Sequence, residues 1–182
     1  MKLTTTLILI LVFHTVAFAT GIDGTYNSKC LPHAENRFFK SEAIIKEQSF
    51  SGKFSLFEDH LCQKLLLIVD YKSEVNYPAA LEIGPIDHKV KSALMLVFSP
   101  EVRNRLNSEG FCLGQEIVIG TPFNIEGKLG CGPLRVPQSG SILFDMYEKK
   151  AGEVSFGAFP LMWILEEEKR PALTSRIAHL LK

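Results

Sequence analysis

Four cysteines, Cys30, Cys62, Cys112 and Cys131, are the residues of this sequence with the clearest chemistry. An even number of cysteines is typical of a chain that folds in an oxidising compartment and pairs them as disulfides. Four cysteines allow three pairings. We favour Cys30–Cys62 together with Cys112–Cys131, because each pair closes a short loop within one local unit. The alternative, a metal site, needs C-x-x-C spacing or neighbouring histidines. The sequence has no paired C-x-x-C spacing and no group of histidines at metal-ligand spacing, so we expect no metal.

Two adjacent Asp-His pairs, Asp59-His60 and Asp87-His88, are the next candidates, as acid–base dyads. Neighbours in an extended segment point to opposite faces, and both pairs fall in expected turns, so turn chemistry is the simpler interpretation. The sequence has no H-E-x-x-H, G-x-S-x-G, phosphate-loop or dinucleotide-binding motif. If all four cysteines are paired, no thiol nucleophile remains. We therefore expect neither an enzyme nor a cofactor.

The first 19 residues have the features of a signal peptide. Lys2 precedes the apolar run 7–13, and residues 17–19 form an A-x-A cleavage signal. The apolar run is shorter than the ~20 residues that a transmembrane helix needs. We expect residues 1–19 to be removed and residues 20–182 to form a single domain that is periplasmic or secreted, with no transmembrane segment after cleavage.

The charge balance does not favour a polyanionic partner. The chain has 20 Lys and Arg against 20 Asp and Glu, for a formal net charge of zero, and no basic run stands out. Binding to nucleic acid or to an anionic membrane depends on clustered positive charge. We therefore expect no nucleic acid partner.

Alternation of apolar and polar residues predicts strands along most of the mature chain. Phe39, Ala43 and Ile45 share one parity, and the pattern resumes after a turn near 48–49. Such alternation marks strands with one buried face. The expected strands lie within 38–75, at 81–83 (ending at Gly84-Pro85), and at 88–98, 111–123, 142–147 and 154–159.

One or two short helices are expected beside these strands. Ser99 is suited to cap a helix that begins at Pro100, and Gly110 is suited to end it. A second short helix is expected within 172–182. About eight to ten strands with regular turns are typical of an antiparallel sandwich or barrel. We favour an all-β antiparallel barrel, because closure leaves no exposed sheet edge.

A set of short motifs occurs in order over most of the mature chain. They are Gly24-Thr25-Tyr26 with Cys30; Phe54, Asp59 and Cys62; Gly110-Phe111-Cys112 with Gly127 and Cys131; Phe144-Asp145-Met146-Tyr147; Val154-Ser155-Phe156-Gly157; and Arg170-Pro171-Ala172-Leu173. The first resembles the G-x-W opening of lipocalin-type barrels, with tyrosine in place of tryptophan. The ordered set is similar to the extracytoplasmic domain named for adenomatosis polyposis coli down-regulated proteins, which also occurs in exported bacterial proteins.

This resemblance implies a lipocalin-like barrel with an apolar interior. In the animal members of that family the barrel binds lipid moieties and restrains lipidated Wnt signals. Of these properties, only the apolar cavity is expected in this chain. The chain is therefore expected to bind a small apolar, lipid-like ligand without a covalent bond.

Side-chain parity identifies the residues expected to face the barrel interior. In a small barrel such residues either fill the interior or surround one small ligand, and parity does not choose between the two. Tyr26 is expected to pack at the closed end of the barrel, beneath Arg170 or Arg176. The residues expected to line a ligand cavity are Phe54, Leu56, Leu67, Val69, Leu94, Leu96, Phe98, Phe144, Met146 and Phe156.

A second hypothesis places the function on the outer surface. Residues 124–140 form a long loop, rich in glycine and proline, that contains Cys131. Long braced loops are common binding elements. The protein would then be an extracytoplasmic protein-binding or inhibitor module with a filled barrel, and an apolar patch near Leu134 and Val136 would favour that alternative.

Overall fold

Antiparallel pairing between strands that follow one another along the chain builds this protein. The computed structural model describes residues 21–34, 36–109, 115–127, 137–159 and 164–172, and the backbone of 179–181. The strands in this part of the chain are β1 (Gly24–Asn27), β2 (Leu31–His33), β3 (Arg37–Lys46), β4 (Ser49–Phe57), β5 (Leu65–Asn76), β6 (Ile83–Val97), β7 (Phe123–Asn124), β8 (Ile142–Lys150), β9 (Glu153–Phe156) and β10 (His179–Leu181). The helices are α1 (Pro100–Ser108) and the 3-10 helix η1 (Glu167–Lys169). The predicted all-β class is confirmed.

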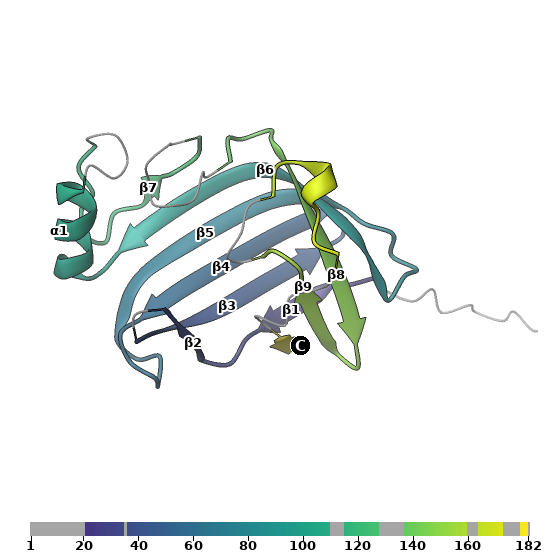
Figure 1. Ribbon diagram of the computed structural model, residues 1–182, viewed down its shortest axis with the longest axis horizontal. Coiled ribbons are helices and arrows are strands. Elements are labelled where there is room, and N and C mark those ends of the chain that lie inside the picture. Colours follow the sequence, from purple (N-terminus) through teal and green to yellow (C-terminus); the bar gives the residue numbers. More distant parts are fainter. Residues whose placement is uncertain are drawn as a thin grey trace, which may run out of the picture.

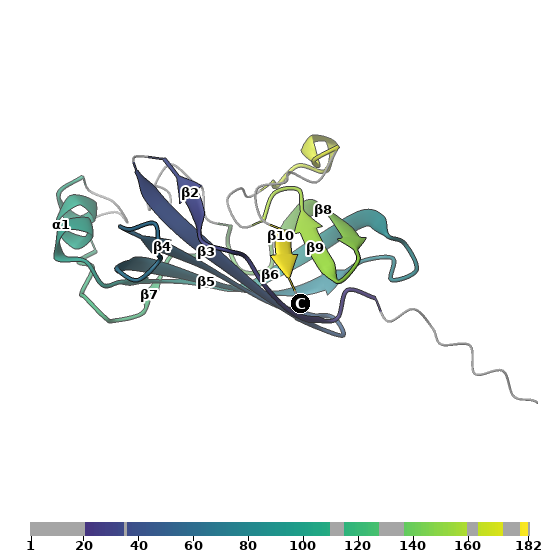
Figure 2. The same cartoon turned by 90° about the horizontal axis from the view of Figure 1, so that it is seen from below.

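The sheet curves until its two ends meet and nearly close a barrel. Its order runs β3-β4-β5-β6-β8-β9-β10-β1, and β1 also pairs with β3. The β1–β3 pairing extends from Gly24↔Ile45 to Asn27↔Glu42, whereas β1 and β10 meet only at Asn27↔Leu181. The long strands β3 to β6 lie side by side in Figure 1, and β8, β9 and β10 stand on one side of that curved sheet in Figure 2. This architecture is the antiparallel lipocalin-like barrel that the sequence predicted.

A bulge between β5 and β6 decides which side chains of β6 face inward. Ser73 of β5 lies opposite Val90, but the preceding Lys72 lies opposite Ser92, so Lys91 is left out of the register. One extra residue in a strand reverses the parity of every residue beyond it. The buried face of β6 therefore changes from Ile86, His88 and Val90 to Ala93, Met95 and Val97.

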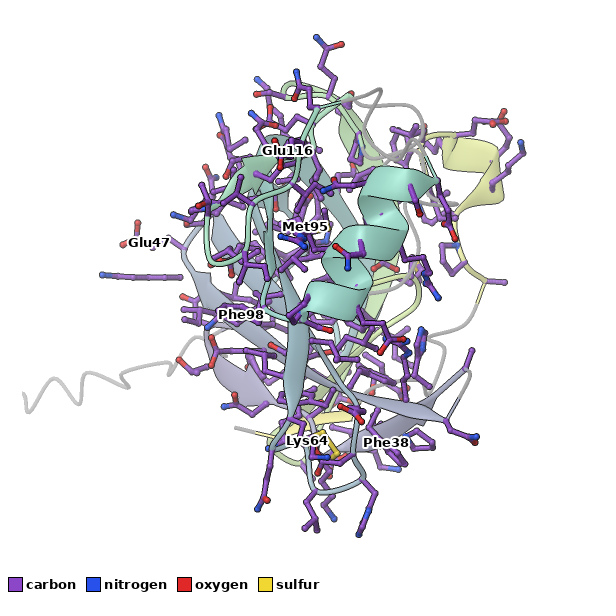
Figure 3. The ribbon with its side chains drawn as sticks, turned by 90° about the vertical axis from the view of Figure 1, so that its left-hand side faces the viewer. Phe38, Glu47, Lys64, Met95, Phe98 and Glu116 are labelled. Atoms are coloured by element: carbon purple, nitrogen blue, oxygen red, sulfur yellow. A yellow bond between two sulfur atoms is a disulfide. The ribbon has the colours of Figure 1, made fainter. Side chains whose placement is uncertain are left out.

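Helix α1 packs at one end of the long strands. Ser99 Oγ accepts a hydrogen bond from the backbone N–H of Val102 at 3.3 Å, and Pro100 is the first helical residue, so the predicted start is confirmed. Val102 and Leu106 are the buried residues of the helix, and they belong to one apolar cluster with Met95. Figure 3 looks onto this end of the barrel, with α1 nearest the viewer and the labelled Met95 beside it.

Three local expectations are wrong. The chain continues through Gly84-Pro85 as part of β6, where Pro85 is exposed, so the proline does not stop the strand. Residues 115–122 are not in a strand, and the pairing there is limited to β7. Residues 179–181 form β10 and not a helix, because pairing with β9 and β1 overrides the local propensity.

The predicted disulfide Cys30–Cys62 is present, with 5.9 Å between its Cα atoms. It joins the segment between β1 and β2 to the loop between β4 and β5, 32 residues further along the chain. Cys112, Cys131 and the expected signal peptide 1–19 lie outside the described residues. Within the described ranges, the helices are all too short or too polar to cross a bilayer.

Candidate functional site

The inner face of the barrel carries an apolar strip that is only half-buried. Phe54 pairs with Val69, and Leu56 pairs with Leu67, so these four side chains of β4 and β5 share one face. All four are partly exposed. They lie between two buried clusters and contact both, Phe54 and Leu56 packing on the one and Leu56, Leu67 and Val69 on the other. We call Phe54, Leu56, Leu67 and Val69 the inner strip.

The opposite end of the same face is densely packed. Phe50 and Tyr71, further along β4 and β5, are 0% and 2% exposed. The Phe50 ring meets the rings of His88 and Phe156 edge-on, with centroids 4.7 and 5.7 Å apart. We call this part of the barrel the packed end and the part beneath α1 the α1 end. Exposure of apolar side chains therefore rises along β4 and β5 from the packed end toward the α1 end.

The ten residues expected to line a cavity divide into three groups. Phe54, Leu56, Leu67 and Val69 form the inner strip. Phe156 shares their face but is 1% exposed within the packed end. Leu94, Leu96, Phe98, Phe144 and Met146 are not brought to the inner strip. Whether any of the ten binds a ligand stays a prediction.

The β6 bulge explains the placement of Leu94 and Leu96. Leu94 lies opposite Asp70 and Leu96 opposite Ile68, on the face away from the inner strip. Simple alternation from Val90 would have placed both inside, but the extra residue turns them outward. Phe98 lies just beyond β6 and is 38% exposed.

On β8 the expected inward-facing residues are wrong, because the other set of alternating side chains faces the barrel interior. Leu143, Asp145 and Tyr147 are the buried residues of this strand, so the half-buried Phe144 and Met146 face outward. The sequence led to the reverse assignment because an acidic residue normally faces solvent. In this barrel the acidic residue is the one inside.

Asp145 is held inside by backbone donors. Its Oδ1 accepts the N–H of Met146 and of Ala158, each at 2.7 Å, and its Oδ2 accepts the N–H of Phe159 at 3.0 Å. Burial raises the pKa of the Asp145 carboxyl to about 6, although these hydrogen bonds act to lower it. The carboxyl group thus fixes the segment after β9 against β8.

Segments from three of the sequence motifs meet at Asp145. Arg170 Nη1 donates to the backbone oxygen of Asp145 at 2.9 Å. A Cβ atom on Gly157 would lie 2.7 Å from Pro171 Cβ and 2.9 Å from Asp145 Oδ1. Only glycine fits at 157 without displacing one of them. Motif residues that are distant in sequence therefore form one packed unit.

No family model and no curated protein matches this sequence.

The ring of Phe159 lies on the backbone of Gly52 in β4. A Cβ atom on Gly52 would come within 2.5 Å of Phe159 Cε2. The ring meets Phe50 and Phe156 edge-on, with centroids 5.1 and 5.6 Å apart. Phe159 was not identified from the sequence as an interior residue that packs on another strand. The available signal was Gly52 itself, since a glycine inside a strand often marks a close approach by another group.

His88 is a fully buried ionisable residue of the packed end. Its Nδ1 lies 3.1 Å from Ser73 Oγ, and its Nε2 has no hydrogen-bond partner in the described part of the chain. Burial lowers the pKa of His88 to about 3. Its neighbour Asp87 faces outward, where Oδ1 lies 2.7 Å from Arg170 Nη2. The pair therefore points to opposite faces, as expected for strand neighbours.

The two buried groups are expected to give opposite pH dependences of stability. His88 has a folded pKa below its ordinary value of 6.5, so its contribution to stability is lost as pH falls from about 6.5 toward 3. Asp145 has a folded pKa above its ordinary 3.8, so its contribution is lost as pH rises from about 4 to 6. Between pH 4 and 6 the two effects oppose each other.

Single substitutions should separate these effects. Relative to wild type, Asp145→Asn should lose stability on acidification from pH 6 to 4, by roughly 1 kcal/mol or more per pH unit. His88→Gln should change in the opposite direction. Urea unfolding at several pH values measures both slopes, and equal slopes in all three proteins would contradict the assignment. Groups common to the three proteins cancel in the comparison.

Arg170 covers the outer side of the barrel and not Tyr26. Its guanidinium carbon lies 5.1 Å from the centroid of the Phe144 ring. Tyr26 is 3% exposed, and its hydroxyl donates to the backbone oxygen of Ile22 at 2.9 Å. The expected packing of Tyr26 beneath Arg170 is therefore wrong, and Arg176 lies outside the described residues. The tail at 164–172 is instead fixed to β6 and β8.

Three clefts on the surface are lined mainly by polar side chains. Two of about 340 Å³ each share Gln48 and Glu74. A third of about 260 Å³ includes Lys40 and Lys53. None of these three contains a residue of the inner strip. In the described part of the chain, no three His, Cys, Asp or Glu side chains lie close enough to hold a metal ion.

The loop expected to bind a protein partner, 124–140, is described only at its two ends. Ile125 N–H donates to the oxygen of Ala93 at 3.1 Å, and Gly140 N–H donates to that of Val90 at 2.9 Å. Both ends are thus attached to β6 near its bulge. Leu134 and Val136, where an apolar patch was expected, lie outside the described residues.

Proposed function

We propose that this protein is an exported carrier that binds a small, lipid-like molecule along the inner strip. The observation that supports the proposal is the partial exposure of Phe54, Leu56, Leu67 and Val69 on the inner face of a barrel whose other end is packed. Apolar side chains left accessible in a concave surface are typical of ligand sites. Small lipid-binding barrels hold their ligands in this way.

The binding energy would come from burial of apolar surface. Covering apolar area is worth ~25 cal/mol per Å², or ~1.5–3 kcal/mol for each Leu, Val or Phe side chain that becomes fully buried. The strip lies on long paired strands, so little ordering is needed on binding. A neutral alkyl or isoprenoid chain suits a strip that has no charged side chain.

Export is part of the proposal. A disulfide is stable in an oxidising compartment, and Cys30–Cys62 fits a periplasmic or secreted protein. The A-x-A signal at 17–19 is consistent with this location. Membership in the adenomatosis polyposis coli down-regulated type of domain is likewise proposed, on the motifs that meet at Asp145. No catalytic role is proposed for the barrel.

Native mass spectrometry of protein recovered from an oxidising compartment tests the carrier hypothesis. We expect a mass excess that is removed by organic extraction and identified as an apolar molecule. Leu67→Gln should reduce the bound fraction, with an affinity loss of roughly tenfold or more, because an unpaired amide is placed against the ligand.

Leu96→Gln is the matched control. Leu96 is half-buried like Leu67 and undergoes the same substitution, but it lies on the outer face. It should retain the ligand. Equal retention by both folded variants, or equal loss, would contradict binding at the inner strip.

A specific observation favours a second candidate, a protein-binding surface at the α1 end. Phe98, Val118 and Ile119 are 38%, 53% and 38% exposed. Gly120 N–H donates to the oxygen of Val97 at 2.9 Å, which places residues 118–120 beside the end of β6. Exposed apolar groups in one place are typical of interfaces. A bare protein mass in the same experiment would favour this function.

A further inference from the structure

The change from packed to partly exposed side chains occurs at one level of the barrel. Gly52 and Tyr71 lie opposite each other in the β4–β5 register. Tyr71 is 2% exposed. The next pair of inward-facing residues toward the α1 end is Phe54 and Val69, and both are half-buried. The boundary between the packed end and the inner strip therefore passes through Gly52.

Phe159 occupies that boundary. Its ring lies on Gly52, in a row that the register continues to Ala43 on one side and to Tyr71 and then Ala93 on the other. The missing side chain at Gly52, next to the small Ala43, leaves room for one aromatic ring at this point of β4. The ring also meets Phe50 and Phe156 of the packed end edge-on.

The position of the ring is determined from two directions. Asp145 Oδ2 accepts the Phe159 N–H at 3.0 Å, so the backbone is attached to β8. The ring itself packs on Gly52 and against the two phenylalanines. A side chain held at both its backbone and its ring has little freedom to move aside for a ligand.

We infer that Phe159, seated on Gly52 and anchored by Asp145, is the floor of the ligand site and limits the length of alkyl chain that the barrel accepts. This inference rests on the proposed carrier function. A chain that enters from the α1 end runs along the inner strip until it meets the ring. Each methylene that fits above the floor adds roughly fourfold to the affinity, and methylenes beyond it add nothing.

A series of saturated fatty acids tests the floor. Affinities of delipidated protein for octanoate, decanoate, dodecanoate, tetradecanoate and hexadecanoate are measured by calorimetry. The affinity of the wild type should rise with chain length up to a limiting length, here called the break, and should not rise beyond it. Phe159→Ala should shift the break to a longer acid, which it binds roughly tenfold more tightly than wild type does. In Gly52→Ala the added Cβ atom would overlap the Phe159 ring, and Phe50 and Phe156 hinder its displacement toward the packed end. We therefore expect the ring to be displaced toward the inner strip and the break to shift to a shorter acid.

Phe57→Ala is the matched control, because Phe57 and Phe159 are both 9% exposed but Phe57 belongs to the outer face. It should leave the break unchanged. Phe159→Leu removes less volume and should shift the break in the same direction as alanine, which provides the test if the alanine variant does not fold.

The outcomes separate the two proposals. If wild type binds no member of the series, the carrier function fails. If wild type shows a break that Phe159→Leu and Gly52→Ala leave in place, or that Phe57→Ala shifts equally, the carrier function stands and the floor is wrong. Opposite shifts by the Phe159 and Gly52 variants would support the floor.

Discussion

Replacement of Asp145 by alanine is expected to lower the free energy of unfolding by about 3 kcal/mol at neutral pH. Three N–H groups would lose their acceptor, the buried ones of Ala158 and Phe159 and the partly buried one of Met146. An unsatisfied buried donor costs ~1–3 kcal/mol. Removal of the carboxylate also relieves the desolvation cost that raises its pKa to about 6, which offsets part of this loss.

Urea or guanidinium unfolding measures this effect. Asp70→Ala is the control, since Asp70 is a half-buried carboxylate on the outer face of β5, and its loss should change the free energy of unfolding by no more than ~0.5 kcal/mol. Asp145→Asn should lie between alanine and wild type, because its carbonyl still accepts two of the three bonds. Equal stability of Asp145→Ala and wild type would show that the segment after β9 does not depend on this carboxyl.

Loss of the Cys30–Cys62 disulfide is expected to lower the free energy of unfolding by at least as much as Asp145→Ala does. The bridge spans 32 residues, and closing a loop of that length removes about 3–4 kcal/mol of chain entropy from the unfolded state. The double variant Cys30→Ala/Cys62→Ala should be less stable by that amount. Cys62 has a φ of 52°, and alanine retains the same backbone strain, so the comparison isolates the bridge.

Reduction provides the control for this prediction. In strong reductant the wild type and the double variant should approach the same stability, because the wild type then loses the same bridge. Without reductant the wild type should be the more stable of the two. A double variant as stable as the oxidised wild type would show that the bridge adds nothing to the fold.

The start of α1 and the existence of β3, β4, β5 and β8 were predictable because their signals are local. Ser99 and Pro100 specify a helix start by hydrogen bonding and a fixed φ, whatever surrounds them. The disulfide was predictable from the cysteine count and loop length. β10 was not, since three residues form a strand there only because β9 and β1 offer them partners.

The inner strip was half predictable. Alternation correctly grouped Phe54 with Leu56 and Leu67 with Val69, because strands β4 and β5 run in register along that stretch. It failed at Leu94, Leu96 and Phe98, since a bulge at Lys91 carries no mark in the sequence that separates it from regular alternation. It failed at Phe144 and Met146 because Asp145, a charged residue, is the one that turns inward.

The sequence by itself determined the all-β class and the start of the helix, and it favoured the pairing of Cys30 with Cys62 among three possible pairings. The class and the helix start depend on side-chain chemistry and on neighbours a few residues away, and the favoured pairing depended on the cysteine count and the loop length. Only the tertiary structure decided which face of β6 and β8 is inside, that Asp145 is buried, and that Phe159 lies on Gly52. Each of these depends on partners distant in sequence, where packing and hydrogen bonding outweigh the local preference of a residue.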